Sequence, residues 1–163
     1  MAPESADTPV YLQPDRAASR RVEDLLDRMT VEEKVAQLTA VRPDEVTVDG
    51  ELDGALVRER LSNGVGHLTR VGGHGGFEPG RVAELVRELQ SFLVAETRLG
   101  VPAIPHEECL SGYMGPDGST FPQAIGLAST FDPGLVEETS RRIREQLLAV
   151  GARHALSPVL DVG

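Results

Sequence analysis

Apolar residues recur at helical intervals in several stretches of the chain and gather into short runs between them. The stretch from Ala17 to Met29 has this helical spacing and predicts a first helix. A second helix follows, because Thr30 and Glu33 form a capping-box pattern. In that pattern the threonine hydroxyl accepts from a free backbone N–H, and the glutamate reaches back to the threonine N–H. Further helices are predicted over residues 53–62, 79–98 and 133–150.

Three short apolar runs between these helices predict strands, at residues 65–69, 101–106 and 154–160. Alternation of strands and helices implies right-handed crossovers and a parallel sheet. We therefore expect an α/β fold with about three strands and preceding N-terminal helices. The third strand ends just before Gly163, which is expected of a piece of a larger α/β domain.

Segments without apolar periodicity are expected to be loops. Residues 1–16 are punctuated by prolines and predict a flexible arm, and residues 42–52 predict a polar, acidic connection. Residues 72–76 contain four glycines in five positions, which disfavours both helix and strand. A further loop is expected from Ser111 to about Pro122.

Charge, cysteine content and the absence of long apolar runs exclude several classes of protein and partner. The 163 residues include 16 Lys+Arg and 26 Asp+Glu, a formal charge of −10, which argues against a nucleic-acid partner. The single cysteine, Cys109, excludes an internal disulfide framework. The sequence opens without a basic, apolar signal peptide and contains no run of about 18 apolar residues. We therefore expect a cytoplasmic protein with no membrane partner.

The strongest candidate for chemistry is His106-Glu107-Glu108, at the C-terminal end of the second predicted strand. Parallel α/β folds place their ligands at that end of the sheet. A carboxylate there can bind sugar hydroxyls or a cationic partner, or it can be a solvated loop residue, and both interpretations stay open. Adjacent strand residues point to opposite faces, so Glu107 and Glu108 are not expected to flank one bond. For zinc, this cluster lacks a third and fourth ligand at a familiar spacing unless His67 or His74 approaches it in space, so no metal is expected.

Other polar positions are weaker candidates. Cys109 lies near His106 but lacks an orienting third residue, which favours a small buried cysteine. His154 begins an apolar strand and is expected to be a core histidine. Asp161 ends that strand, either as a ligand contact or as a residue that orders the following loop. The glycines of residues 72–76 have neither the lysine nor the spacing of a phosphate-binding loop.

Four segments, in order along the chain, resemble the N-terminal domain of glycoside hydrolase family 3, the β-glucosidase and β-xylosidase type. They are Arg21–Leu38, Leu99–Gly112, Thr120–Asp132 and Leu156–Val162. The resemblance implies a (β/α)8 TIM-type barrel, of which residues 17–163 would form the first part, with the barrel incomplete. In the family, the carboxylate of an E-x-L-H-G segment binds sugar hydroxyls in the −1 subsite.

The matching position in this chain is Glu108, the one residue that the resemblance assigns to substrate binding. Ser111 stands where the family has histidine, so the resemblance does not define the local geometry at this position. His106, Glu107, Ser111 and Asp161 are further candidates for lining the site.

The resemblance also implies a reaction. A retaining glycosidase forms a glycosyl-enzyme on an Asp nucleophile and uses a second carboxyl group as acid and base. Neither group matches a position in this chain, so no catalytic residue is assigned here and the fragment alone is expected to be inactive. The parent is expected to be an exo-acting β-glucosidase or β-xylosidase without a cofactor.

Its expected partners are a β-linked oligosaccharide or aryl glycoside and the missing C-terminal part of the parent protein. The alternative is a non-enzymatic acidic module that binds a sugar or a protein.

Overall fold

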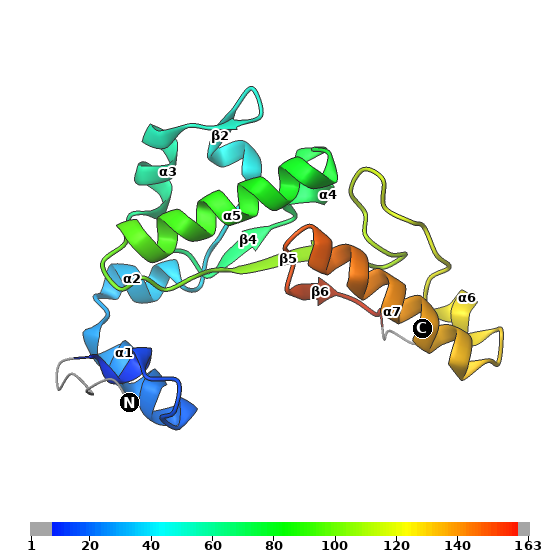
Figure 1. Cartoon of the computed structure of the whole chain (residues 1–163), viewed down its shortest axis with the longest axis horizontal. Helices are drawn as coiled ribbons and strands as arrows, with labels where there is room; N and C mark the ends of the chain where they lie inside the picture. Colours follow the sequence, from blue (N-terminus) through cyan, green and yellow to red (C-terminus); the bar gives the residue numbers. More distant parts are fainter. Residues whose placement is uncertain (1–7, 160–163) are drawn as a thin grey trace, which may run out of the picture.

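The computed structural model describes residues 8–159, and a four-stranded parallel sheet lies at its centre (Figure 1). The strands, in their order across the sheet, are β1 (Ala40–Val41), β4 (His67–Thr69), β5 (Ile104–Glu108) and β6 (His154–Leu156). A separate antiparallel hairpin pairs β2 (Thr47–Val48) with β3 (Glu51–Leu52). The predicted α/β class with a parallel sheet is therefore confirmed.

Helices occupy the intervals between the strands. They are α1 (Ala18–Arg28), α2 (Val31–Ala36), α3 (Gly54–Leu61), α4 (Val71–Gly75), α5 (Pro79–Glu96), α6 (Ala124–Ala128) and α7 (Pro133–Ala149), with 3-10 turns η1 (Val10–Leu12) and η2 (Pro43–Glu45). The five helices predicted from the sequence are present as α1, α2, α3, α5 and α7. The capping box at α2 also forms, with Glu33 N donating to Thr30 Oγ1 at 3.2 Å and Thr30 N donating to Glu33 Oε2 at 2.9 Å.

The second predicted strand is displaced along the chain, and a fourth strand joins the sheet. The prediction placed the strand at residues 101–106, whereas β5 begins at Ile104 and contains Pro105. The Pro105 carbonyl accepts from Arg153 N, and Arg153 precedes the first residue of β6. Proline has no N–H to donate, and it is tolerated here because its position lies at the start of the β5–β6 pairing. The additional strand, β1, has only two residues and pairs with β4.

The prediction of a loop at residues 72–76 is wrong, because residues 71–75 form the short helix α4. The expected connection at residues 42–52 likewise contains η2 and the β2–β3 hairpin. Asp49 and Gly50, at the tip of that hairpin, both have positive φ, at 52° and 83°. Two successive positive φ angles match a type I′ turn, for which Asp-Gly is a favoured pair.

The core lies between α5 and the sheet. The apolar stripe of α5 is buried in one cluster with Leu68 of β4 and with residues of α3. Its members are Val82, Leu85, Val86, Leu89 and Leu93. In Figure 1 this helix runs along one side of β4 and β5. On the opposite side of the sheet, the side chains of His67, His106 and Glu108 are only partly buried, and we call this side the open face.

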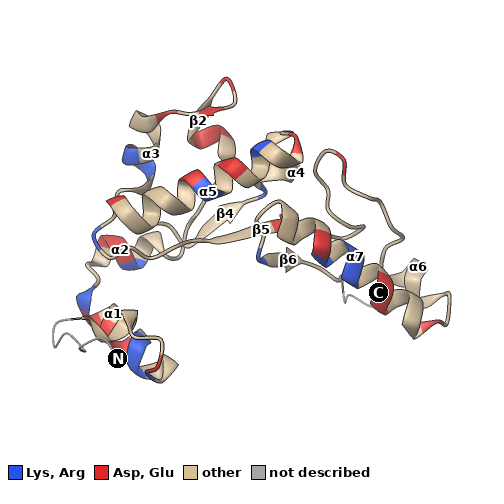
Figure 2. Ribbon diagram, viewed as in Figure 1, with Lys and Arg blue, Asp and Glu red and all other residues tan. Residues whose placement is uncertain are grey.

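The outer surfaces of the helices carry opposite charges close together (Figure 2). On α7, Arg141 and Arg142 both pair with Glu138 and Glu145. Such exposed pairs contribute about 0–1 kcal/mol each. Within residues 8–159, no helix is both long enough and apolar enough to cross a bilayer.

Of the predicted flexible arm, residues 1–7 lie outside the described residues, whereas Tyr11 makes hydrogen bonds with the rest of the chain. Tyr11 N donates to Asp24 at 3.0 Å, and the Tyr11 hydroxyl donates to the Leu99 carbonyl at 2.8 Å. Arg21 donates to the Tyr11 carbonyl at 3.0 Å. The turn η1 is therefore fixed against α1 and against the connection that follows α5.

Candidate active-site face

Three histidines from adjacent strands share the open face of the sheet. His106 of β5 is directly opposite His154 of β6, and His67 of β4 lies on the same face of the neighbouring strand. The ring centroids of His67 and His106 are 5.2 Å apart, and each lies 6.1 Å from the ring of His154. The parallel register thus builds a layer of three imidazoles. His154 is exposed on this face, so the expectation of a core histidine is wrong.

The layer makes His106 difficult to protonate. His106 is half-buried, and its Nδ1 lies 3.2 Å from Nδ1 of His67. Burial lowers the pKa of His106, and the neighbouring His67 and His154 lower it further, against the opposing effect of Glu108. The neutral imidazole is therefore favoured at the centre of this face.

Glu108 lies two residues beyond His106 on β5 and therefore on the same face as the histidines. It is partly exposed at the C-terminal end of the strand. Barrels of parallel strands place their active sites at that end. The carboxylate that the sequence singled out thus lies at the end of the strand where such folds bind their ligands.

Glu107 points to the opposite side of β5, as the strand alternation predicted, and it is 2% exposed. Its carboxylate accepts from Gly72 N at 2.7 Å and from Gly73 N at 3.1 Å. Burial raises the pKa of Glu107, although these two N–H donors and the charge of Arg70 act in the opposite direction. Glu107 therefore caps α4 from a neighbouring strand, which favours a helix in this glycine-rich segment, and it does not share the face of the three histidines.

Arg70 lies between β4 and α4 and was not singled out from the sequence. Its backbone is left-handed, with φ 49° and ψ 49°, and its N–H donates to the His106 carbonyl at 2.8 Å. A left-handed conformation at a non-glycine residue is strained and is held by its surroundings. The signal available in the sequence was only its position after a strand, beside glycines.

Three buried polar atoms in this corner have no hydrogen-bond partner in the described part of the chain. They are Thr69 Oγ1, Arg70 Nε and Tyr113 Oη. Tyr113 packs against two glycines so closely that a Cβ at Gly72 would lie 1.8 Å from its hydroxyl, and one at Gly115 would lie 2.2 Å away. The loop after β5 can thus pack closely on α4 because Gly72 and Gly115 leave room for the Tyr113 ring.

The remaining sequence candidates contribute less. Cys109 is buried, and burial together with the charges of Glu107 and Glu108 raises the pKa of its thiol to about 11. Such a thiol is a poor nucleophile at neutral pH. Ser111 is half-buried after β5, where its carbonyl accepts from Phe121 N at 2.8 Å. Asp161 lies outside the described residues. Between residues 8 and 159, no three His, Cys, Asp or Glu side chains are arranged to hold a metal ion.

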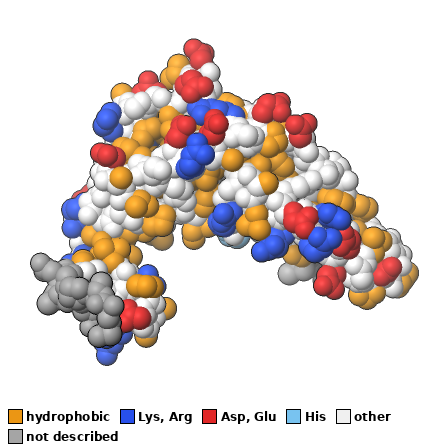
Figure 3. All heavy atoms as spheres, in the orientation of Figure 1, with side chains coloured by type: hydrophobic (Ala, Val, Ile, Leu, Met, Phe, Trp, Pro, Cys, Tyr) orange, Lys and Arg blue, Asp and Glu red, His pale blue; other side chains and the backbone are white. Residues whose placement is uncertain are grey.

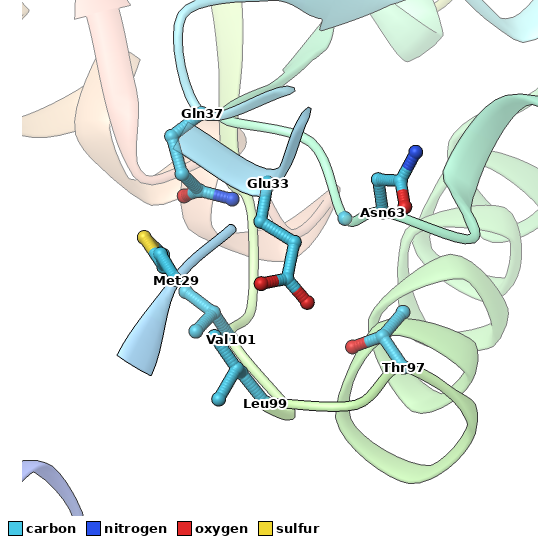
Figure 4. A pocket seen from close by; sticks show the side chains of 8 residues that line it. Met29, Glu33, Gln37, Asn63, Thr97, Leu99 and Val101 are labelled. Carbon is cyan, nitrogen blue, oxygen red and sulfur yellow. The ribbon is translucent and has the colours of Figure 1, made fainter. Parts of the chain in front are cut away.

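A small hollow lies at the other end of the strands (Figure 4). Its volume is about 10 Å³, and Glu33, Gln37 and Thr97 contribute to its lining. Arg98 donates to the Glu33 carboxylate at 2.9 Å through Nε, and this guanidinium lowers the pKa of Glu33. The hollow has room for about one water, and its position before the strands is typical of a stabilising contact.

Comparison with known proteins agrees with this geometry. The sequence model described as "Glycosyl hydrolase family 3 N terminal domain" matches residues 30–163. The chain belongs to glycoside hydrolase family 3. The structure of the chain is similar to that of a β-glucosidase from Erythrobacter marinus, with a TM-score of 0.79 and 26% identity, over 95% of this chain and 20% of that chain.

Curated family 3 relatives show the same partial coverage. The "Probable beta-glucosidase C" of Aspergillus oryzae is 32% identical over 95% of this chain and 26% of its own length. A "Periplasmic beta-glucosidase/beta-xylosidase" of Dickeya chrysanthemi is 31% identical over 89% of this chain and 24% of its length. The chain therefore spans about a quarter of the length of these relatives, and its four parallel strands are consistent with part of a TIM-type barrel.

Proposed function

We propose that this chain forms part of the sugar-binding site of a β-glucoside- or β-xyloside-cleaving enzyme, with Glu108 accepting hydrogen bonds from hydroxyls of the sugar. The observation that carries the proposal is that the two neighbouring carboxylates on β5 have different surroundings. Glu107 is occupied by the N–H groups of Gly72 and Gly73, whereas Glu108 lies on the open face at the C-terminal end of the strand. The family 3 relatives named β-glucosidase and β-xylosidase support this choice of substrate.

The proposed role of Glu108 is to bind and orient the substrate. A carboxylate that accepts two hydroxyl hydrogen bonds contributes about 1.5–3 kcal/mol per charge-assisted bond. The retaining reaction also needs a nucleophile and an acid/base, which we assign to no residue of this chain. We therefore expect the isolated chain to bind a glycoside weakly and to leave aryl β-glucosides and β-xylosides unhydrolysed.

NMR titration of the ¹⁵N-labelled chain with methyl β-D-glucopyranoside and methyl β-D-xylopyranoside tests the proposal. We expect amide shifts around residues 106–108 and in Arg70, with an affinity reduced at least about tenfold in Glu108→Gln. The matched control is Glu137→Gln, because Glu137 is exposed on α7, away from this face. Binding that survives Glu108→Gln unchanged, or no binding of either glycoside, contradicts the proposal.

A further inference from the structure

Arg70 is a half-buried arginine whose guanidinium has no acceptor within residues 8–159. Two other arginines in this part of the chain are half-buried, and both are paired. Arg21 donates to the Tyr11 carbonyl, and Arg81 pairs with three carboxylates. Over α5 and α7, Figure 3 likewise shows Lys and Arg side chains beside Asp and Glu. Taking a cation partly out of water without a partner costs free energy, so the unpaired guanidinium of Arg70 needs a physical reason.

The stem of Arg70 is enclosed, while the end of its guanidinium stays accessible. Nε is buried, and a Cβ built at Gly73 would lie 3.7 Å from it, so the stem lies close over this glycine. The two terminal nitrogens are not enclosed in this way. The backbone is left-handed and is held by the bond from Arg70 N to the His106 carbonyl. Strain of this kind collects at functional sites, and a donor held in one geometry loses little entropy when it binds a ligand.

Arg70 lies at the C-terminal end of the sheet, one position beyond the last β4–β5 pair. That pair joins Thr69 to His106, so the continued register sets Arg70 beside Glu107, one residue before Glu108. Burial raises the pKa of Glu107, whereas two glycine N–H groups and the charge of Arg70 lower it, so the guanidinium is close by. Within the described residues, however, no ion pair joins Arg70 to either carboxylate. This end of the sheet therefore offers a free acceptor, Glu108, and a free donor, Arg70.

We propose that Arg70 is a second sugar-binding residue, which donates to a hydroxyl oxygen of the same glycoside whose hydroxyls donate to Glu108. A sugar hydroxyl both donates and accepts, so one hydroxyl or two adjacent ones can bridge the carboxylate and the guanidinium. A neutral sugar suits this pair because the two charges balance, whereas an anionic sugar would meet both carboxylates of β5. The inference rests on the proposed function, since it places Arg70 beside the sugar that Glu108 binds. The ligand class is a neutral pyranoside with adjacent free hydroxyls.

The buried Nε–H of Arg70 allows a test on the unmodified chain by NMR. Because this proton is enclosed, it should exchange slowly with water and give its own ¹⁵N–¹H signal near neutral pH. Loss of the signal in Arg70→Lys assigns it. Titration with methyl β-D-glucopyranoside should shift the signal with the same dissociation constant as the amides of residues 106–108. A signal that stays fixed while those amides shift overturns the proposal and leaves Glu108 as the sugar contact.

Substitution of Arg70 measures what the guanidinium contributes. Arg70→Gln removes the charge but keeps a long, unbranched side chain on the left-handed backbone, and it should weaken binding of the glucoside at least about tenfold. Arg70→Lys keeps the charge without the planar fork and should recover only part of this loss. The matched control is Arg81→Gln, because Arg81 is also half-buried but lies on α5, across the sheet from the open face. A purely structural role would lower the Tm of Arg70→Gln and leave the affinity of the folded chain unchanged, which overturns the proposal.

Monodeoxy forms of methyl β-D-glucopyranoside, each lacking one hydroxyl, show whether Arg70 contacts the sugar directly. We expect at least one form to bind the unmodified chain about tenfold more weakly than the parent sugar, but to bind Arg70→Gln as well as the parent sugar does. Equal losses in both chains for every form overturn the proposal. A loss of affinity in Glu108→Gln but not in Arg70→Gln overturns this inference alone, whereas an unmodified chain that binds no glycoside overturns it together with the proposed function.

Discussion

Nδ1 of His67 and Nδ1 of His106 lie 3.2 Å apart across the β4–β5 ladder. At this separation one ring donates and the other accepts, so one of the two imidazoles must be unprotonated at Nδ1. Protonating both rings would place two positive charges next to each other on adjacent strands, with His154 as a third neighbour. The layer therefore links proton binding to the stability of the sheet.

The first prediction is that stability falls on acidification. The pKa of His106 is lowered in the folded chain by burial and by the other two histidines, whereas the unfolded chain protonates this ring near its ordinary value of about 6.5. The contribution of His106 is therefore fully present above about pH 6.5 and is lost as the pH falls through that value towards the lower, folded pKa. Urea unfolding between about pH 8 and pH 5 measures the loss.

Substitutions within the layer test the cause of this pH dependence. His67→Gln and His154→Gln should each raise the pKa of His106 in an NMR titration. His74→Gln, remote from the layer and next to Asp44, is the control and should leave it unchanged. An unsubstituted chain in which His106 titrates at or above about 6.5 contradicts the prediction.

The second prediction concerns the cap of α4. Glu107→Gln should destabilise the chain by about 1–3 kcal/mol, because the neutral amide offers one oxygen to two N–H groups and its own NH2 donors are buried. Glu108→Gln, on the open face, should change stability by less than about 0.5 kcal/mol. Thermal or urea unfolding of both variants provides the measurement. Equal losses for the two substitutions would show that the strand register is misassigned.

The third prediction tests the packing of Tyr113 on α4. Gly72→Ala places a Cβ 1.8 Å from the Tyr113 hydroxyl and 2.8 Å from its ring carbon Cζ, so the loop after β5 must shift. We expect a loss of about 1–3 kcal/mol. Gly80→Ala on α5 is the control, since its Cβ meets nothing within 4 Å, and it should stabilise the chain by about 0.4–1 kcal/mol. A Gly72→Ala chain as stable as the parent would contradict this packing.

The fourth prediction is chemical. Because burial and nearby carboxylates raise the pKa of Cys109 to about 11, its thiol should resist iodoacetamide at about pH 8. In urea the same thiol should react at the rate of a free cysteine. Mass spectrometry after timed quenching distinguishes the two rates, and rapid labelling without denaturant would show that the thiol is accessible.

The sequence predicted those elements whose signal is local. The apolar stripe of α5 and the Thr30–Glu33 box each lie within one helix, and both form as expected. The β2–β3 hairpin was missed although Asp49-Gly50 is a strong turn pair, because its two-residue strands give no visible alternation. Strand β1 was missed for the same reason.

Features that depend on partners far along the chain were beyond sequence reasoning. A glycine-rich stretch becomes α4 only because Glu107, which follows it by more than 30 residues, accepts from its first N–H groups. Strand alternation did predict that the side chains of Glu107 and Glu108 point to opposite faces of the sheet. The histidine layer was not foreseen, since only the register of β4, β5 and β6 brings its three members together.

The order of the strands across the sheet has a consequence for how the chain acquires its structure. Each strand from β1 to β6 lies beside the next strand of the same sheet along the chain, and the connecting α5 packs onto the unit it joins. Pairing between consecutive strands of the sheet closes shorter stretches of chain than pairing between more distant strands would. The β1–β4–β5 unit can therefore assemble while later residues are still being synthesised, and β6 is added at its growing edge. Folding can advance in the direction of translation, with each completed strand serving as the template for the next.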